Sequence, residues 1–405
     1  MSTTQLEVSW TGVDGALAHV GTLALEADAQ RQRFAYSADW LEHGFPIGVD
    51  LPLSTGPLSP PDGAPTFGVL DDACPGLWGR AVIASGNREE RPSALGLLAA
   101  VADVSRQGAL RLSASVDAAP LAPGDLASTT DAKALLADIE SFQRGDIDRE
   151  GTHRILLGAS SQGGARPKLA LRDDRTGGIV MAKYPAVADT YDLLTCEAVA
   201  LQVARDAGLS ACSSQLLRID AHRAILLVDR FDRRDRGRLG YQSMHTAAQL
   251  HGAGDFSYRV AVDAARALVG TQAARAVVAR AALSICLHDV DDHPWNMGFL
   301  RDADGWRAAP VFDVVPCPDE RDGTPLEGTT SERSLEQLLD LDWELPRSEV
   351  LDLTTRVAQV ARGAWERAPK DFGLDPQDAR MCERIIESTC DFDTVLDGRE
   401  ARYTS

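Results

Sequence analysis

The segment His288–Asn296 holds five ionisable side chains and one Asn within nine residues, directly after an apolar run. Because a buried charge needs a partner, this segment is either a solvated acidic loop or a chemical site. The spacing from Asp291 to Asn296 is that of a kinase catalytic loop, in which the Asp orients the acceptor hydroxyl and the Asn holds magnesium. Asp313 stands at the end of a predicted apolar strand, where a carboxylate suits a second magnesium ligand.

A second segment with chemical potential is the Gly loop, Gly158–Lys168, which leads into a predicted strand–turn–strand that ends at Lys183. Gly residues let backbone N–H groups converge on an anion such as phosphate, although such loops also occur as plain turns. A Lys on the strand after a Gly-rich loop, with Glu197 on the next helix, is the arrangement that grips nucleotide phosphates in kinases. The alternative is a Lys on an edge strand that points to solvent.

A rival interpretation assigns the His residues to a metal. The doublet His288-Asp289 stands at a predicted helix end, and His245, His251 and Asp313 can complete a metal cage of the kind that an HD-type metal-dependent phosphohydrolase uses. This interpretation leaves the Gly loop unexplained.

Strands in the first half and helices in the second are needed to position these groups. Alternating residues predict a small antiparallel sheet over residues 5–37 and hairpins over 169–183 and 214–228. Apolar periodicity predicts helices over residues 71–85, 93–104, 130–142, 191–207, 258–269, 272–288, 331–341, 348–367 and 376–388, with a strand pair over 306–314. Asp375 and Pro376 are the expected N-cap and first residue of the last helix.

The composition is that of a soluble globular protein of 405 residues, long enough for two or three domains or one enzyme with two lobes. The net charge of −19 argues against a broad surface that coats nucleic acid. Only four of the 41 basic residues are Lys, and two of these four are Lys168 and Lys183.

The seven Cys residues form no CxxC pair, which predicts buried free thiols in a reducing compartment. The N-terminus lacks a basic and apolar leader, and no run of about 18 apolar residues occurs. We therefore expect a cytoplasmic protein that does not enter a membrane.

With these residues in view, the chain resembles the HipA family of bacterial serine/threonine kinases, the toxins of type II toxin–antitoxin modules. Five segments carry the resemblance: Asp71–Arg80, Ser161–Lys168, Val228–Asp232, Val290–Asn296 and Pro310–Val314. The resemblance implies an α+β, bilobal, protein-kinase-like fold with a strand-rich N-terminal lobe, an extra N-terminal subdomain and a mostly helical C-terminal lobe. It implies an N-terminal subdomain over residues 1–112, a kinase N-lobe over 113–228 and a helical C-lobe over 229–405.

The resemblance also implies ATP and Mg²⁺ as cofactors and gives the site residues their roles. Asp291 would orient the acceptor hydroxyl, His293 would support the catalytic loop, and Asn296 and Asp313 would hold magnesium. The residues expected to bind the nucleotide are Gly163, Gly164, Ala165, Lys168, Lys183, Glu197, Asp229 and Phe231, the last two through the backbone of the hinge.

Ser161 aligns with the loop serine that family members phosphorylate on themselves, and Ser160 is a neighbouring alternative acceptor. The added negative charge would repel ATP and switch the enzyme off.

The partners that the resemblance implies are a protein substrate, with aminoacyl-tRNA synthetases among the family's targets, and a HipB-like helix-turn-helix antitoxin that neutralises the kinase. Operator DNA would be bound indirectly, through the antitoxin, which would supply most phosphate contacts. A catalytically idle corepressor is the non-enzymatic alternative. The intact Lys183, Asp291, Asn296 and Asp313 argue against it.

Overall fold

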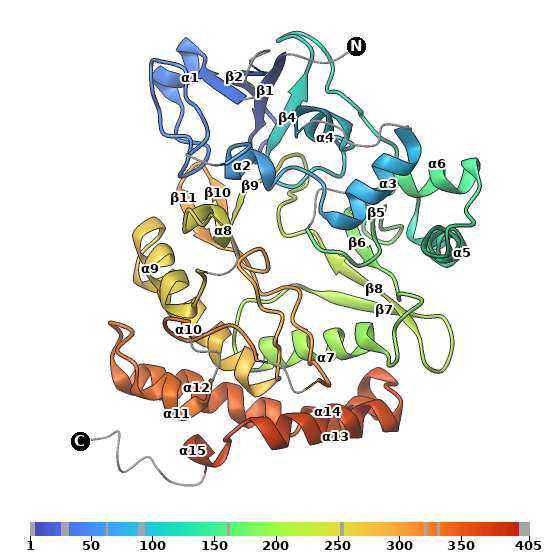
Figure 1. The fold of residues 1–405 in the computed structure, drawn as a ribbon, viewed down its shortest axis with the longest axis vertical. Coiled ribbons are helices and arrows are strands. Elements are labelled where there is room, and N and C mark those ends of the chain that lie inside the picture. The colour runs from blue at the N-terminus through green and yellow to red at the C-terminus, as the bar shows by residue number, and fades with distance from the viewer. Residues whose placement is uncertain are drawn as a thin grey trace. The chain divides into compact units, whose positions relative to one another are not determined.

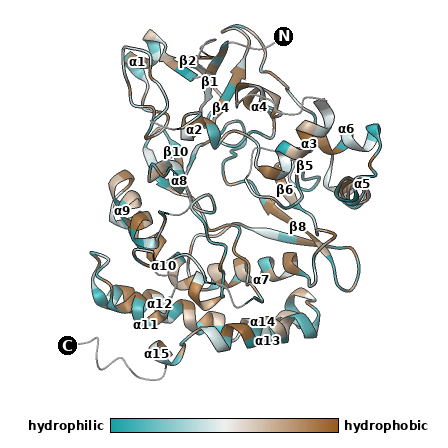
Figure 2. Ribbon diagram, viewed as in Figure 1, coloured by the Kyte–Doolittle hydropathy of each residue, from teal (hydrophilic) through white to brown (hydrophobic). Residues whose placement is uncertain are grey.

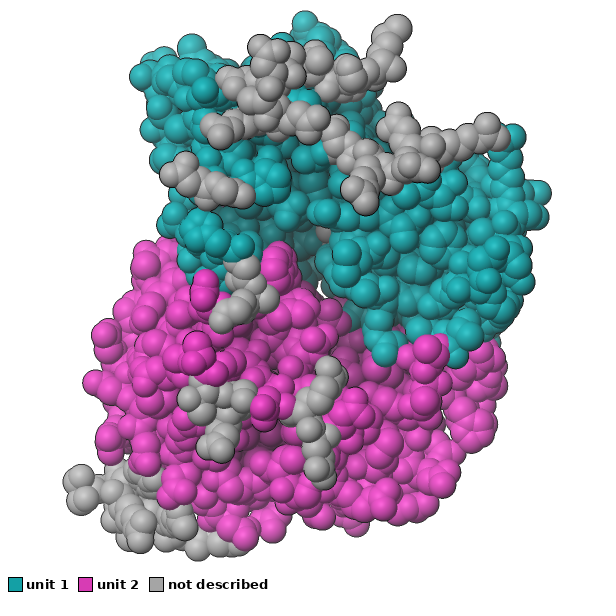
Figure 3. Space-filling model, viewed as in Figure 1, with its two compact units in different colours: residues 1–187, 229–251, 299–305 teal, residues 188–228, 252–298, 306–405 magenta. Residues whose placement is uncertain are grey.

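The computed structural model divides the chain into two compact units, which Figure 3 distinguishes by colour. Unit 1 comprises residues 1–187, 229–251 and 299–305, and unit 2 comprises residues 188–228, 252–298 and 306–405. Within them, the structure describes residues 5–25, 32–61, 64–87, 94–159, 163–251, 255–319, 322–329 and 333–396.

Unit 1 begins with a four-stranded antiparallel sheet in the order β3-β2-β1-β4 (Figure 1). Its strands are β1 (Gln5–Thr11), β2 (Leu17–Leu25), β3 (Gln32–Tyr36) and β4 (Leu110–Ser113). The apolar side chains of this sheet are buried against one another and form the core of this region. The antiparallel sheet expected at the N-terminus is therefore present, with β4 as an unexpected fourth strand.

The remaining elements of unit 1 include the helices that surround the Gly loop. They are α1 (Ala38–His43), α2 (Gly68–Asp71), α3 (Leu77–Asn87), α4 (Ala94–Ala100), η1 (Thr129–Asp131), α5 (Ala132–Arg144), α6 (Arg149–Gly158), β5 (Lys168–Arg172), β6 (Ile179–Lys183), β9 (Gly240–Ser243) and α8 (Met244–Ala247). Helix α6, which sequence reasoning missed, begins where Asp148 caps it by accepting a 2.7 Å hydrogen bond from the Gly151 N–H.

A buried ionic network holds the segment that follows β8 inside unit 1. Asp232 accepts hydrogen bonds from Arg230 at 2.7 and 2.8 Å, from Arg233 at 2.8 Å and from the Gly108 N–H at 2.8 Å. Burial alone would raise the pKa of Asp232, but the two guanidinium charges hold it below the ordinary value. Arg230 also donates to the Ser105 carbonyl at 3.0 Å, so these charges fix the segment against the loop before β4.

Unit 2 is mostly helical. It contains α7 (Leu193–Asp206), the antiparallel hairpin of β7 (Ser214–Arg218) and β8 (Ala224–Asp229), α9 (Tyr258–Leu268), α10 (Thr271–Cys286), α11 (Leu335–Asp340), α12 (Arg347–Arg362), α13 (Ala364–Phe372), α14 (Pro376–Thr389) and α15 (Asp393–Leu396). Helix α10 packs against α9 and α12. Figure 2 shows both hydrophilic and hydrophobic residues along α12, as an amphipathic helix requires.

The expected α+β fold, with antiparallel strands in the N-terminal part and helices in the C-terminal part, is confirmed. Several expected boundaries were wrong. The helix expected to begin at Asp71 begins instead at Leu77, as α3. The helix expected over residues 348–367 is two helices that break at Gly363. The strand pair expected over 306–314 lies earlier, as β10 (Gly298–Asp302) and β11 (Gly305–Ala308), because Gly305 takes a left-handed conformation at the turn.

Two further observations concern expectations from composition. All seven cysteines are free thiols, and all except Cys317 are buried. Within the described ranges, no helix has the length and apolar character needed to cross a membrane.

Candidate active site

Two candidate lysines lie at one end of the β5–β6 hairpin, next to the Gly loop. Lys168 and Lys183 lie directly opposite each other across the two antiparallel strands. Lys168 is buried, and its ammonium group donates a hydrogen bond to the Gly163 carbonyl. Like charges directly opposite each other destabilise a strand pair, so an anion bound beside them would be stabilising.

The Gly loop is shaped by two glycines with different surroundings. Gly164 has a φ of +101°, and a Cβ atom there would lie 2.6 Å from the Lys168 Nζ atom. Among the described residues, no atom lies within 4 Å of a Cβ atom built on Gly163. A side chain is thus not excluded at Gly163 by these residues, whereas Gly164 makes the turn that Lys168 braces. Ala165 follows in the same bend, whereas Ser160 and Ser161 lie outside the described residues.

The expected hinge residues are held by the ionic network described above. Asp229 ends β8 and is exposed. The Phe231 ring packs on Tyr241, with 6.0 Å between ring centroids. Glu197 lies buried in α7 of unit 2, whereas Lys183 belongs to unit 1, so their expected pairing stays a prediction.

The candidate catalytic loop of unit 2 is anchored by one buried ion pair. Arg280, on α10, donates to both carboxylate oxygens of Asp292 at 2.7 and 3.0 Å, and the Tyr258 hydroxyl donates to the same carboxylate. The Asp292 side chain has no exposed surface. Burial would lower the pKa of Arg280, but the Asp292 carboxylate raises it above the ordinary value. The Asp292 carboxylate thus anchors the loop to α10.

Asp289 is also buried, and its backbone carbonyl is hydrogen-bonded within unit 2. The Arg333 guanidinium donates to the Asp289 carbonyl at 2.6 Å and to the Ser284 hydroxyl at 2.8 Å. Burial and the nearby Asp292 charge raise the pKa of the Asp289 carboxyl group well above its ordinary value. The Asp289 carboxylate also accepts a 3.3 Å hydrogen bond from the Asp291 N–H, so it contributes to the shape of the loop.

Asp291 is exposed, whereas Asp289 and Asp292 are buried. Its carbonyl accepts hydrogen bonds from the His293 N–H at 2.8 Å and from the Asn296 side-chain amide at 3.1 Å. The His293 ring stands edge-on to Trp295, 5.8 Å between centroids. The loop therefore closes on itself and leaves the Asp291 carboxylate as the accessible one among its three aspartates.

The structure corrects the expected surroundings of Asp313. This residue does not end a strand, since Val311 makes only an isolated bridge with Ala211. Asp313 instead has a φ of +55°, a left-handed conformation that costs a non-Gly residue free energy and that clusters at functional sites. The guanidinium of Arg280 donates to the Phe312 carbonyl at 3.2 Å. One arginine thus braces both the catalytic loop and the segment of Asp313.

Sequence reasoning missed the residues that hold this loop, namely Tyr258, Arg280 and Arg333. The sequence contained one signal for Arg280, which opens the apolar run before the loop. A charge within a buried helix needs a buried partner, and the nearest candidates are the aspartates of the loop.

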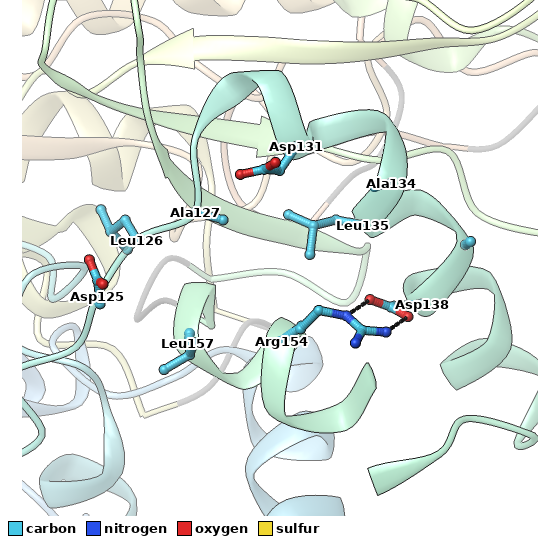
Figure 4. A pocket seen from close by; sticks show the side chains of 10 residues that line it. Asp125, Leu126, Ala127, Asp131, Ala134, Leu135, Asp138, Arg154 and Leu157 are labelled. Atoms are coloured by element: carbon cyan, nitrogen blue, oxygen red, sulfur yellow. Dashed lines mark hydrogen bonds and ion pairs between the residues drawn. The ribbon is translucent and has the colours of Figure 1, made fainter. Parts of the chain in front are cut away.

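A cavity of about 540 Å³ in unit 1 contains none of these candidate residues. Figure 4 shows it between the segment before η1, α5 and α6, with Arg154 paired to Asp138 at 2.7 Å. Asp125 and Asp131 add negative charge to its lining. Such a lining repels phosphate, so the cavity does not suit a nucleotide's phosphates.

The metal-centred hydrolase gains no support from the geometry. Among the described residues, no three His, Cys, Asp or Glu side chains are grouped to hold a metal ion. The His288 ring contacts the Asp319 carbonyl at 3.0 Å. Magnesium held by Asn296 and Asp313 would not require such a group, since this ion takes few protein ligands and completes its shell with phosphate and water.

Comparisons with models of known protein families show to which family the chain belongs. A model described as HipA-like C-terminal domain matches residues 160–384, more than half of the chain. A second, described as HipA N-terminal domain, matches residues 13–113. The chain belongs to the HipA family.

One solved structure agrees with this assignment at the level of the fold. The chain is similar to HipA of Shewanella oneidensis MR-1, solved with HipB and its operator DNA, at 16% identity, with a TM-score of 0.71 and 99% of each chain covered. A proinflammatory kinase of Helicobacter pylori, CtkA, matches at 14% identity over 60% of this chain and 92% of its own, with a TM-score of 0.43. The comparison with curated proteins found no match.

The anchoring role of Asp292 predicts a difference in stability between neighbouring variants. Asp292→Ala should lower the free energy of unfolding by about 3–5 kcal/mol, because it leaves Arg280 as an uncompensated buried charge. The exposed Asp291→Ala should change it by less than about 0.5 kcal/mol. Urea unfolding followed by circular dichroism measures both. Equal losses in the two variants would contradict the assignment of Asp292 to the anchor.

Proposed function

We propose that this HipA-family protein is an ATP- and magnesium-dependent protein serine/threonine kinase. The observation that carries the proposal is the arrangement around Arg280, which braces the loop of Asp291 and Asn296 and the segment of Asp313 at once. Kinase chemistry needs these functional groups in fixed positions, since phosphoryl transfer is catalysed mainly by positioning and charge neutralisation.

The residues of unit 1 fit the phosphates of a nucleotide. Lys168 and Lys183 place two positive charges at the end of one hairpin, where they oppose each other across the strands. None of the described residues lies within 4 Å of a Cβ atom built on Gly163, so they would not block a phosphate from the backbone there. In this proposal, Lys183 contacts the nucleotide phosphates, and Lys168 secures the Gly loop through the Gly163 carbonyl.

The residues of unit 2 supply the acceptor side of the reaction. The exposed Asp291 would orient the acceptor hydroxyl and take its proton as the hydroxyl oxygen bonds to the γ-phosphorus and the bond from that phosphorus to the β,γ-bridging oxygen breaks, which releases ADP. Asn296 and Asp313 offer the oxygen ligands that magnesium prefers, and His293 would support the loop. Magnesium bound with ATP supplies neutralisation of the charge on the phosphates.

A phosphotransfer assay tests the proposed role of Asp291. The purified protein with magnesium and ATP should phosphorylate itself or a protein in a lysate, and Asp291→Asn should reduce the rate by at least about 10²-fold, the contribution expected of a general base. Asp263→Asn is the matched control, because Asp263 is an exposed residue of α9 outside the site.

Two outcomes would count against the kinase. Undiminished labelling by Asp291→Asn would remove that residue from the site. Metal-dependent release of phosphate from nucleotides that is lost in His288→Ala would favour the hydrolase.

The protein substrate and the site of autophosphorylation belong to the same proposal. The acceptor within the chain would be Ser161, or its neighbour Ser160, and the cellular target would be a protein, with aminoacyl-tRNA synthetases the first class to test. Phosphate added to this loop would compete with ATP for the positive charges of Lys168 and Lys183. In this proposal the activity would take place in the cytoplasm and would promote persistence.

We further propose a HipB-like helix-turn-helix antitoxin as the partner. The similar HipA of Shewanella oneidensis was solved with such a protein and operator DNA. Because this chain carries a net charge of −19, the antitoxin would supply the contacts to DNA phosphates.

This partnership predicts how the chain behaves with DNA. An electrophoretic shift of the operator upstream of its own gene should require a co-expressed helix-turn-helix partner, and the chain alone should produce none. A shift by the isolated chain would contradict the indirect contact. A shift with the partner but without phosphotransfer by the released chain would favour the idle corepressor.

A further inference from the structure

The segment Pro75–Trp78 contacts the Gly loop within unit 1. The backbone N–H of Trp78 donates a hydrogen bond of 3.3 Å to the Gly164 carbonyl. Gly164 is the residue whose left-handed conformation makes the turn of the loop. A segment from the N-terminal part of the chain therefore holds the loop at its turn.

The contact at Gly76 is too close for any side chain. A Cβ atom there would lie 2.8 Å from the Gly163 Cα atom and 2.9 Å from the Gly164 backbone nitrogen. Real Cβ atoms do not approach other atoms so closely, and both neighbours are backbone atoms that no rotamer change can move away. Only glycine at position 76 permits the observed position of the loop.

The segment itself is held rigidly. The Arg80 guanidinium donates to the Pro75 carbonyl at 2.8 Å and to Asp71 at 3.3 Å. The buried Trp78 ring stands edge-on to Phe142 of α5, with 5.0 Å between centroids. Aromatic pairs of this geometry stabilise beyond the area that they bury.

Helix α3, which continues from this segment, also holds the chain on the other side of the loop. It packs against α6, which ends at Gly158, where the Gly loop begins. The start of the loop and its turn thus both rest on α3 and the segment that leads into it.

We propose that Pro75–Trp78 is a bracket that sets the position of the Gly loop for nucleotide binding, with Gly76 and Trp78 as positioning residues. This inference rests on the proposed kinase function. Neither residue touches ATP; each acts through the backbone of Gly163 and Gly164. If the loop were displaced by about one bond length, its N–H groups and the Lys168 ammonium would no longer lie where they can bind phosphate.

Gly76→Ala tests the bracket. We expect the KM for ATP to rise by at least about tenfold, since displacements of ~1 Å at a remote position are enough to cost such factors. The effect should appear more strongly in KM than in kcat, because the catalytic loop of unit 2 is unchanged. Gly86→Ala is the matched control on the same helix. It meets only a flexible side chain end and should leave KM unchanged.

Hydrogen exchange separates this inference from the function on which it rests. Without nucleotide, Gly76→Ala should speed amide exchange of Trp78 and of residues 163–168, whereas Gly86→Ala should not. A wild-type protein that binds no nucleotide but shows this coupling would overturn the kinase and leave the bracket standing. A functional kinase in which Gly76→Ala changes neither KM nor exchange would overturn the bracket.

Phe142→Leu provides a second variant if Gly76→Ala does not fold. This substitution leaves the backbone of the bracket unchanged and removes the aromatic ring against which Trp78 packs. We expect the KM for ATP to rise about threefold, in proportion to the loss of one aromatic pair, together with faster exchange of the Trp78 amide. Unchanged values for both quantities would overturn the proposal.

Discussion

The buried ion pair between Arg280 and Asp292 is the interaction on which the candidate catalytic site depends. Such a pair adds little net stability over an apolar replacement, but it is costly to break, so it specifies one arrangement of the loop. The same guanidinium donates a hydrogen bond to the Phe312 carbonyl and thereby also holds the segment that contains Asp313. Asp291 and Asp313 are therefore positioned by a residue that does not itself take part in chemistry.

In unit 1 the Gly loop is positioned through hydrogen bonds to its own backbone carbonyls. The Gly loop is held from inside by Lys168, through the Gly163 carbonyl, and from outside by Trp78, through the Gly164 carbonyl. Glycine is required at positions 76 and 164 for different reasons: close approach at the first and a left-handed turn at the second. A loop fixed in this way would need little reorganisation to bind the phosphate that we propose as its ligand.

Local signals were predictable from the sequence, and contacts distant along the chain were not. Helix α14 begins as expected, with the Asp375 side chain accepting a 2.7 Å hydrogen bond from the Gln377 N–H. Spacing alone made Asp291 the candidate, whereas the pairing of Asp292 with Arg280 could be seen only in the folded structure. The approach of Gly76 to the Gly loop had no signal at all, because no local pattern reports which distant segment will pack there.

The most direct test of the central claim follows a label from ATP carried either on the γ- or on the α-phosphate. The protein is incubated with magnesium and each labelled ATP, and phosphoamino acids are then identified after acid hydrolysis of the protein. In-line transfer predicts label in phosphoserine or phosphothreonine from the γ-phosphate only. Label on protein from the α-phosphate, or release of free phosphate without labelled protein, would contradict a protein kinase.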